Sequence, residues 1–291
     1  MNILILGGNG YLGSRIVKKF LDEGHMLTCT KRRKSDLSRL ENVKDKIHFI
    51  PASVDAVDAA LRYEKPDFIL NMACSYEQAG GLYKDIIESN MEFPLHVLDS
   101  AAGYGIKKYI TMGTGLPSGF NMYSFSKKML SEFGSFYAEQ YHMDFYNMKL
   151  EMFYGPDEPE GRFIPDLIDA MLDGREVNVT EGTQHRDIIS VDDVVNAVFL
   201  VLYSPLKGYH EIPVGTGTAP AVSEIVDFIW ENTGKKSKIN RGSMQKRRNE
   251  PDCVADTLLL KEMGGWNPVY WKDGIHIMIN EIKNKKSLKG E

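Results

Sequence analysis

A tyrosine and a lysine near the middle of the sequence could form an acid–base pair. Tyr123 and Lys127 are four positions apart in a predicted helix, so their side chains lie on one face. A phenol has a pKa of about 10, and a neighbouring ammonium favours the phenolate and brings that pKa toward the working range of a catalyst. Thr114 follows a strand predicted over residues 109–112 and could give a second hydrogen bond to the same substrate oxygen. We therefore predict that Tyr123, Lys127 and Thr114 are catalytic.

The Tyr-x-x-x-Lys spacing has an alternative interpretation. It occurs by chance in many helices, where it usually means a half-buried ring beside a solvated amine. Two other features favour catalysis, namely the threonine at the strand end and a glycine-rich turn near the N-terminus that is typical of nucleotide binding.

The glycine-rich turn lies between a predicted strand and a predicted helix. Residues 2–6 are a continuous apolar run, as expected of a strand buried on both faces of a parallel sheet, and Gly24 ends the helix. The glycines between them match both GxGxxG and GxxGxxG. Such a turn lets backbone amides approach a pyrophosphate and brings the positive end of a helix against it. We assign cofactor binding to Gly7, Gly10, Tyr11, Leu12 and Gly13.

The second predicted strand indicates which dinucleotide binds. An NAD site usually carries an acid about 20 residues after the glycines. Here no acid lies between Glu23 and Asp36, and the strand runs instead into a basic segment, residues 31–34. Cations at this position would bind a 2'-phosphate, so we predict NADP(H) with Lys31 and Arg32 as ligands. The alternative is a solvated basic loop.

Strands and helices alternate up to about residue 155, which predicts an α/β fold with a doubly wound parallel sheet of the Rossmann type. Further strands are predicted over residues 26–30, 47–50, 67–73 and 144–151, and helices over residues 55–63 and 82–103, the latter kinked by Pro94. Residues at the strand ends join the predicted cofactor site: Ser53, Val54, Met72 and Ala73. Residues 74–81 are a predicted loop on the nicotinamide side, in which Cys74 is a small loop residue rather than a nucleophile.

The elements become short and irregular after Tyr154-Gly155-Pro156. Helices are predicted over residues 163–172, 221–234, 256–263 and 272–286, with Asp256 as an N-cap, and a short strand over residues 177–180. Residues 184–202 predict a strand-like piece followed by a helix. We predict two domains: residues 1–155 with about 186–203 bind NADP, and about 156–185 with 204–291 form a smaller α/β domain that binds the substrate.

Composition and charge exclude several classes of function. The 291 residues are 43% apolar and 26% charged, as in ordinary globular proteins, and the net charge of −5 argues against nucleic-acid binding. No apolar run has the length of a membrane span, so we expect a cytoplasmic protein. Three separated cysteines fit a reducing compartment, and the seven histidines show no ligand spacing, which predicts no metal site.

Taken together, the motifs resemble those of the extended short-chain dehydrogenase/reductases, the NAD-dependent epimerase/dehydratase family. The resemblance covers nearly the whole chain and rests on the glycine turn, Asn90, the Tyr123/Lys127 pair and these segments: NMA at 71–73, TMGT at 111–114, FYGP at 153–156, RDIISVDD at 186–193, RRNEPD at 247–252 and GGWNP at 264–268. It implies that Tyr123 donates or accepts the proton, that Lys127 also binds the nicotinamide ribose, and that Thr114 bonds the reacting oxygen.

The resemblance also implies a set of substrate-binding residues: Asn90, Thr114, Phe163, Arg186 and Arg247. Asn90 could point toward the catalytic strand or be a surface amide. Arg186 and Arg247 match positions where relatives touch the nucleotide half of a nucleotide-sugar substrate. Each of them could otherwise be a surface salt-bridge residue.

Two segments narrow the resemblance. Thr114 is followed by Gly115 and Leu116, where the dehydratase branch has an acidic pair, so dehydration is not expected. Residues 114–128 and 180–193 resemble the CDP-abequose and CDP-paratose synthases of deoxysugar and O-antigen biosynthesis, which reduce the 4-keto group of a CDP-3,6-dideoxyhexulose with NADPH. We therefore expect a 4-ketoreductase. The alternatives are an NAD-dependent nucleotide-sugar 4-epimerase and a non-catalytic NADP-binding sensor.

The helix that Tyr123 opens is too apolar for a helix with one face in water. It carries Phe125, Met129, Phe133, Phe136, Tyr137 and Tyr141. Relatives pair this helix with the kinked helix before it, so we expect a homodimer.

Overall fold

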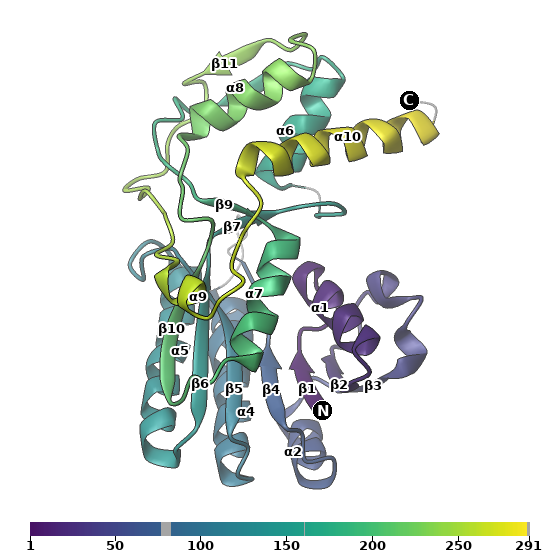
Figure 1. Ribbon diagram of the computed structural model, residues 1–291, viewed down its shortest axis with the longest axis vertical. Helices are drawn as coiled ribbons and strands as arrows, with labels where there is room; N and C mark the ends of the chain where they lie inside the picture. Colours follow the sequence, from purple (N-terminus) through teal and green to yellow (C-terminus); the bar gives the residue numbers. More distant parts are fainter. Residues whose placement is uncertain (77–82, 160, 290–291) are drawn as a thin grey trace. The chain divides into compact units, whose positions relative to one another are not determined.

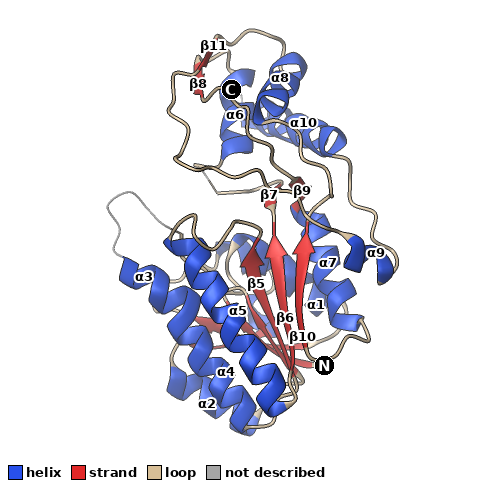
Figure 2. Cartoon of the chain, turned by 90° about the vertical axis from the view of Figure 1, so that its left-hand side faces the viewer, coloured by secondary structure: helices blue, strands red, loops and turns tan. Residues whose placement is uncertain are grey.

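The computed structural model describes residues 1–76, 83–159 and 161–289, and its largest element is a seven-stranded sheet (Figure 1). The strand order is β10-β6-β5-β4-β1-β2-β3. The strands are β1 (Asn2–Leu6), β2 (Met26–Lys31), β3 (Ile47–Pro51), β4 (Phe68–Asn71), β5 (Lys108–Thr114), β6 (Asp144–Leu150) and β10 (Tyr209–Val214). The neighbouring pairs β3/β2, β2/β1, β1/β4 and β4/β5 are parallel. Figure 2 shows the arrows of β5, β6 and β10 pointing the same way. The predicted Rossmann-type sheet is confirmed.

Helices cover both faces of this sheet. On one face, α2 (Val54–Tyr63), α4 (Phe93–Gly103) and α5 (Met122–Tyr141) bury apolar side chains against β1, β4 and β5 (Figure 2). On the other face, α1 (Tyr11–Asp22) and α7 (Val191–Tyr203) meet where Phe20 packs on Phe68 and Phe199. Two short 3-10 turns, η1 (Ser38–Leu40) and η2 (Lys44–Lys46), join β2 to β3. The strand order reverses between β1 and β4, and such a switch point is where open α/β sheets bind ligands.

The helix predicted over residues 82–103 differs in one respect from the prediction. The chain is helical from Tyr83 through α3 (Tyr83–Ile87), a π turn η3 (Glu88–Glu92) and α4, while Leu82 lies outside the described residues. The wide turn closes through a bond from the Phe93 N–H to the Glu88 carbonyl. Pro94 has no N–H, so the ordinary bond to the carbonyl four residues earlier cannot form, and the disturbance falls in the turn before the proline.

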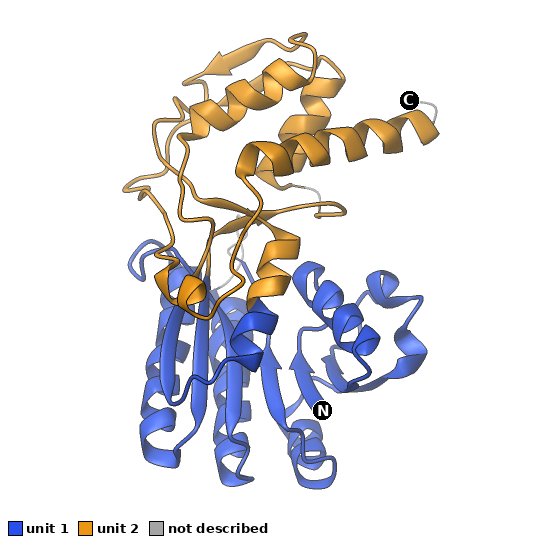
Figure 3. Ribbon diagram, in the orientation of Figure 1, with its two compact units in different colours: residues 1–149, 198–212 blue, residues 150–197, 213–291 orange. Residues whose placement is uncertain are grey.

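The chain divides into two compact units, drawn in blue and orange in Figure 3. Unit 1 comprises residues 1–149 and 198–212, and unit 2 comprises residues 150–197 and 213–291. The sequence predicts a boundary at residue 155 and a returning segment at about 186–203. The difference arises because the strand that rejoins the sheet is β10 rather than the segment near residue 188. The assignment of cofactor and substrate to the two units stays a prediction.

Unit 2 has its own core between three helices. Apolar side chains of α6 (Phe163–Leu172), α8 (Val222–Asn232) and α10 (Trp271–Lys289) pack together there. Two short parallel pairs accompany them: β7 (Met152–Tyr154) with β9 (Ile188–Ser190), and β8 (Val177–Val179) with β11 (Ile239–Arg241). The bounds of α6 are as predicted. The helix expected from Asp256 is α9 (Leu258–Glu262), whose N-cap is Thr257, and the Asp256 carboxylate instead accepts the Leu258 N–H at 3.1 Å.

Candidate active site

The glycine turn lies where β1 ends and α1 begins. Gly7 has a left-handed backbone (φ 78°), and a Cβ added there would lie 2.8 Å from the backbone of Met72 and Ala73, just after β4. A Cβ on Gly13 would collide with the Gly7 carbonyl oxygen. The N-cap of α1 is Gly10, which has no side chain to occupy the free N–H groups of the first turn. A bare backbone turn at a helix N-terminus suits a pyrophosphate.

Most of the predicted cofactor residues gather at this turn. They are Gly7, Gly10, Tyr11, Leu12 and Gly13 in the turn and the start of α1, with Met72 and Ala73 beside them. Ser53 and Val54 lie near the end of β2, because the neighbouring Ala52 donates its N–H to the Lys31 carbonyl at 2.9 Å. Ser53 is the N-cap of α2 and Val54 its first residue.

The basic segment, residues 31–34, begins at the end of β2. The loop that follows it is hydrogen-bonded to the glycine turn. Asn9 in the turn donates from Nδ2 to the Asp36 carbonyl at 3.1 Å. The Asp36 carboxylate accepts the N–H and the hydroxyl of Ser38, each at 2.8 Å, and these bonds lower the pKa of Asp36. Lys31 is partly buried at the strand end, and residues 32–34 are exposed. The nearest acid after the run is therefore engaged by Ser38, while the cations of residues 32–34 are exposed.

Thr114 and the Tyr123 side chain are neighbours at the end of β5, where Thr114 influences the pKa of the phenol. Thr114 is the last residue of β5, and Tyr123 is the second residue of α5. A capping box fixes this helix end, since Asn121 Oδ1 accepts the Ser124 N–H at 2.8 Å and Ser124 Oγ accepts the Asn121 N–H at 3.2 Å. The cap orients the first helical turn and with it the Tyr123 side chain.

The pKa of Tyr123 moves in the direction opposite to the one predicted. Burial raises it well above its ordinary value, and the Cys74 and Tyr76 side chains raise it further. The hydrogen bond from Thr114 opposes them and lowers it. Burial dominates because a phenolate loses more solvation than a phenol. Tyr123 is therefore a protonated phenol at neutral pH.

Lys127 is buried one turn along α5 from Tyr123. Its Nζ donates to the Ala73 carbonyl at 3.1 Å, so it holds the segment that follows β4. Burial lowers the pKa of Lys127, and the neighbouring Cys74 raises it. The lysine thus contacts the backbone beside the predicted nicotinamide position.

Two residues at this site were missed as partners of Tyr123. Cys74, predicted as a small loop residue, lies close enough to the Tyr123 side chain to raise its pKa. The ring of Tyr76 lies 5.0 Å from the Tyr123 ring between centroids, with planes 30° apart. Both follow the end of β4, and residues 77–81 of the same predicted loop lie outside the described residues. The sequence could have indicated both residues, because they follow β4, which is the neighbour of β5 in the sheet.

Asn90 is buried in the π turn, so its interpretation as a surface amide is wrong. Its Oδ1 accepts the Ser75 N–H at 2.7 Å, and its Nδ2 donates to the Ser75 carbonyl at 2.9 Å and to Ser126 Oγ at 3.2 Å. Ser126 Oγ in turn donates to the Tyr123 carbonyl at 2.8 Å. Both amide hydrogens are used within unit 1, so Asn90 positions the chain around Tyr123.

The sequence profile of the NAD dependent epimerase/dehydratase family matches residues 3–215. The chain belongs to this family. The family resemblance expected from the sequence is confirmed. CDP-abequose synthase from Salmonella typhimurium is 29% identical, covering 96% of this chain and 98% of its own length. UDP-glucose 4-epimerase from Mycolicibacterium smegmatis is 25% identical over 98% of this chain and 99% of its own. The structure of UDP-glucose 4-epimerase from Thermotoga maritima superposes with a TM-score of 0.86, at 23% identity, over 98% and 99% of the two chains.

Arg186 makes its hydrogen bonds to other residues of unit 2. Its guanidinium donates to the Glu250 carboxylate at 2.6 Å, to the His185 carbonyl at 2.8 Å and to the Pro251 carbonyl. The arginine therefore holds the segment that carries Arg247, which is exposed. Phe163, the other substrate candidate of unit 2, is the first residue of α6 and is exposed.

Asp187, next to Arg186, was not singled out from the sequence. It is fully buried, and its carboxylate accepts the N–H groups of Thr216, Gly217 and Ala255 at 2.8, 2.9 and 3.2 Å. The Thr216 hydroxyl adds a bond at 2.7 Å. This acid of the RDIISVDD segment thus ties together three stretches of unit 2 and has a structural role.

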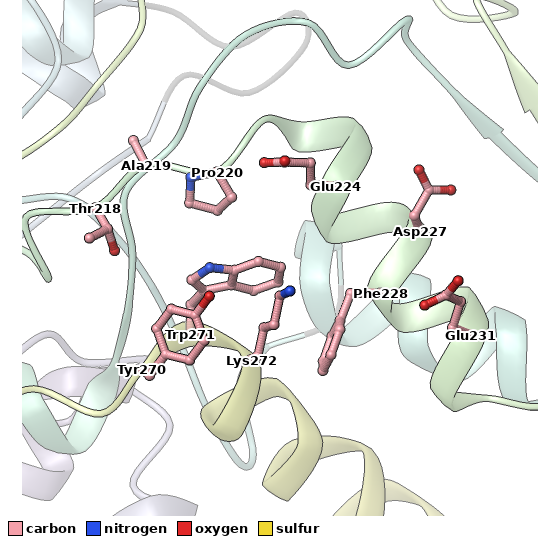
Figure 4. A pocket seen from close by; sticks show the side chains of 10 residues that line it. All are labelled: Thr218, Ala219, Pro220, Glu224, Asp227, Phe228, Glu231, Tyr270, Trp271 and Lys272. Atoms are coloured by element: carbon pink, nitrogen blue, oxygen red, sulfur yellow. The ribbon is translucent and has the colours of Figure 1, made fainter.

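An open groove of about 460 Å³ lies between α8 and the start of α10 within unit 2 (Figure 4). Its lining residues are Thr218, Ala219, Pro220, Glu224, Asp227, Phe228, Glu231, Tyr270, Trp271 and Lys272. Asp227 pairs with Arg241, and the Lys272 ammonium lies 5.6 Å and 5.4 Å from the ring centroids of Phe228 and Trp271. None of the predicted site residues lines this groove.

Two further properties concern the described part of the chain. No three His, Cys, Asp or Glu side chains within residues 1–76, 83–159 and 161–289 are grouped so as to hold a metal ion. Within the same ranges, no helix has the length and apolar character that crossing a membrane requires.

Proposed function

We propose that this chain is an NADPH-dependent reductase of the 4-keto group of a nucleotide-linked deoxyhexulose, with CDP as the nucleotide. The observation that carries this is the similarity to CDP-abequose synthase from Salmonella typhimurium over 96% of this chain. The proximity of Thr114 and Tyr123 at the end of β5 supports the same chemistry.

Tyr123 acts as the proton donor in this proposal. Bound NADPH supplies a hydride to the carbonyl carbon. The Tyr123 hydroxyl gives its proton to the carbonyl oxygen, and the Thr114 hydroxyl bonds the same oxygen. A raised pKa suits this role because the phenol remains protonated at neutral pH, and the oxyanion that receives the proton is a far stronger base than a phenolate. Lys127, which bonds the Ala73 carbonyl at 3.1 Å, would also hold the nicotinamide ribose.

The bare turn of Gly7, Gly10 and Gly13 fits a dinucleotide, since a Cβ on Gly7 or Gly13 would fill the space that close backbone approach requires. We take the cofactor to be NADPH because exposed cations follow β2 and Asp36 is bonded to Ser38. Lys31 and Arg32 would hold the 2'-phosphate. In unit 2, Phe163 and Arg247 would contact the nucleotide sugar, while Arg186 and Asn90 act through the segments that they hold.

A nucleotide-sugar 4-epimerase is the second candidate. The similarity to UDP-glucose 4-epimerase from Mycolicibacterium smegmatis over 98% of this chain favours it. An epimerase first removes a proton from the C4 hydroxyl and later returns it to the same oxygen, so Tyr123 would serve in either candidate. A non-catalytic NADP-binding sensor would not need Thr114, Tyr123 and Lys127 together at one strand end.

The decisive experiment follows nicotinamide absorbance with the purified protein. With a CDP-4-keto-deoxyhexulose, a reductase consumes NADPH steadily through many turnovers. Equilibration of C4 epimers without added cofactor, and without net change in absorbance, would instead identify an epimerase. A thermal-shift panel of CDP, dTDP, UDP and GDP sugars tests the base, because a ligand that binds only the folded state raises the melting temperature.

We further propose that the protein is a homodimer that pairs α5 and α4 of two protomers. The large aromatic side chains that α5 leaves exposed are Phe125, Phe133, Phe136 and Tyr141. A helix with so many exposed rings is unusual for a monomer surface, and burial of these rings against a second copy would remove their contact with water.

A further inference from the structure

Asn147 of β6 lies between the strand that ends at Thr114 and the helix that carries Tyr123. Its side chain is buried, and its Nδ2 donates to Ser131 Oγ at 2.8 Å, about two turns along α5 from Tyr123. Ser131 is fully buried, and its hydroxyl donates to Glu211 Oε1 at 3.1 Å. Two strands of the sheet, β6 and β10, therefore hold the same point of α5.

The other side of the Asn147 amide faces Gly113, the residue before Thr114 in β5. A Cβ added to Gly113 would collide with Asn147 Oδ1, and its next nearest neighbours would be the amide carbon and Nδ2 of Asn147, at 3.0 and 3.2 Å. Gly113 does not have the left-handed φ that favours glycine, so lack of space excludes a larger residue here. The Asn147 amide thus packs directly against the end of β5.

The amide oxygen of Asn147 is in an unfavourable place. Oδ1 is buried and accepts no hydrogen bond from the described part of the chain. A buried acceptor without a donor lowers stability, and an apolar side chain of similar size would avoid that loss. An amide at this position therefore has a use other than stability.

We propose that Asn147 is a positioning residue that braces the end of β5 against α5 and so sets the spacing between Thr114 and Tyr123. Without the amide, Gly113 loses its neighbour and Ser131 its donor, and the strand end and the helix are then free to shift. A misplacement of about 1 Å can lower turnover by up to about 10²-fold even when the altered residue does not touch the substrate. The inference rests on the proposed roles of Thr114 and Tyr123 and applies to keto reduction and C4 epimerisation alike.

A double-mutant cycle separates positioning from a general loss of stability. We expect Asn147→Ala to lower kcat about tenfold with KM within about twofold of wild type, because a positioning residue makes no contact with the substrate. In a Thr114→Val background the same substitution should change kcat by less than about twofold, since the hydroxyl whose spacing matters is already absent. The control Thr28→Val removes a different buried hydroxyl bond of unit 1, to Glu64, and should leave kcat unchanged.

Gly113→Ala tests the same contact by adding volume. The new methyl group pushes against the Asn147 amide, so kcat should fall about tenfold or more. Its three nearest neighbours all belong to the Asn147 side chain, so Asn147→Ala makes room for it, and the double variant should recover to the kcat of Asn147→Ala alone. Should Asn147→Ala fail to fold, Ser131→Ala removes the same bond from the helix side and replaces it in the cycle with Thr114→Val.

Three results would overturn the inference. Asn147→Ala could retain the kcat of wild type. Its effect could multiply with that of Thr114→Val, which would mean that the two residues act independently. Alternatively, Thr28→Val could lower kcat as much as Asn147→Ala, which would assign the loss to general destabilisation.

Crystal structures separate this inference from the proposed function. If wild type turns over neither a 4-keto nor a 4-hydroxy nucleotide sugar, the proposed function fails. Asn147 is then judged by the distance between Thr114 Oγ1 and the Tyr123 hydroxyl oxygen in wild type and in Asn147→Ala. An increase of about 1 Å supports positioning, because a shift of that size is enough to affect turnover. An unchanged distance overturns it.

Discussion

The side chain of Asn90 bonds the backbone of Ser75 in both directions, accepting its N–H at 2.7 Å and donating to its carbonyl at 2.9 Å. Asn90 lies in the π turn that precedes Pro94, so an irregular helical turn supplies the contact. Ser75 stands between Cys74 and Tyr76, and both of these side chains adjoin Tyr123. One amide thus fixes the surroundings of the predicted proton donor.

Asn90→Ala should lower both stability and turnover. The substitution leaves the N–H and carbonyl of Ser75 without their partner, and a buried polar group without a hydrogen bond costs about 1–3 kcal/mol. Urea unfolding should report a loss of about 2 kcal/mol or more, and kcat should fall because Cys74 and Tyr76 are no longer held. The exposed Asn42→Ala is the control. Unchanged stability and kcat would show that Ser75 is held by other contacts.

Tyr123→Phe should lower turnover by about 10²–10⁴, the usual worth of a positioned general acid. NADPH affinity should stay unchanged, because the lost hydroxyl acts on the substrate oxygen. Tyr104→Phe is the matched control, since it removes a hydroxyl from a tyrosine that follows α4. A variant that retains full kcat would remove Tyr123 from the mechanism.

The pH profile of wild type tests the protonation state of Tyr123. Burial raises its pKa, so the phenol stays protonated as pH rises through the neutral range. The kcat of reduction should therefore remain level from about pH 7 to 9 and decline only at higher pH. A reaction that used the phenolate would accelerate over the same interval, which would contradict proton donation as the role of this residue.

The sequence predicted those helices and strands that a pattern of neighbouring residues determines. β1 and α6 have the predicted bounds because a continuous apolar run and an amphipathic period each depend on neighbouring residues. β10 was missed because its sequence, YHEIPV, has the polar residues His210 and Glu211 near its start and contains Pro213, so it has no continuous apolar run. The pKa of Tyr123 was predicted from Lys127 alone, whereas burial and the contacts of Cys74 and Tyr76 set it. Those contacts depend on packing between distant segments.

Replacement of Lys31 and Arg32 by glutamine should abolish the preference for NADPH. Each charge-assisted hydrogen bond to the 2'-phosphate contributes about 1.5–3 kcal/mol, so NADPH affinity should fall tenfold or more per residue. NADH affinity should be unchanged, because NADH has no phosphate at this position. Lys46→Gln, at an exposed lysine of η2, controls for net charge. Equal affinities of wild type for the two cofactors would assign the basic segment to solvated surface.

Phe136→Lys should convert the dimer to a monomer. The ring is exposed on α5, so a lysine there leaves the protomer intact but buries a charge in the proposed contact. Light scattering at micromolar concentration should report half the wild-type mass, with an unchanged circular dichroism spectrum. Tyr63→Lys, at an exposed ring of α2, should remain dimeric. A wild-type protein that is already monomeric would remove the proposal.

Glu211 on β10 should make part of the stability of unit 1 depend on pH. Burial would raise the pKa of its carboxyl, but bonds from Lys128 and Tyr209, each at 3.1 Å, and the charge of Lys149 lower that pKa to about 2. The folded-state pKa lies below the ordinary value of 4.5, so the stabilisation is present above pH 4.5 and is lost as pH falls toward 2.

Glu211→Gln should therefore be less stable than wild type at pH 7, by about 1–2 kcal/mol for a partly exposed network, and the difference should shrink below pH 4.5. Urea unfolding between pH 7 and pH 3 measures both curves. Glu139→Gln removes an exposed carboxylate from α5 and should run parallel to wild type. A difference between Glu211→Gln and wild type that stays constant with pH would mean that the lost bonds do not depend on the charge of Glu211.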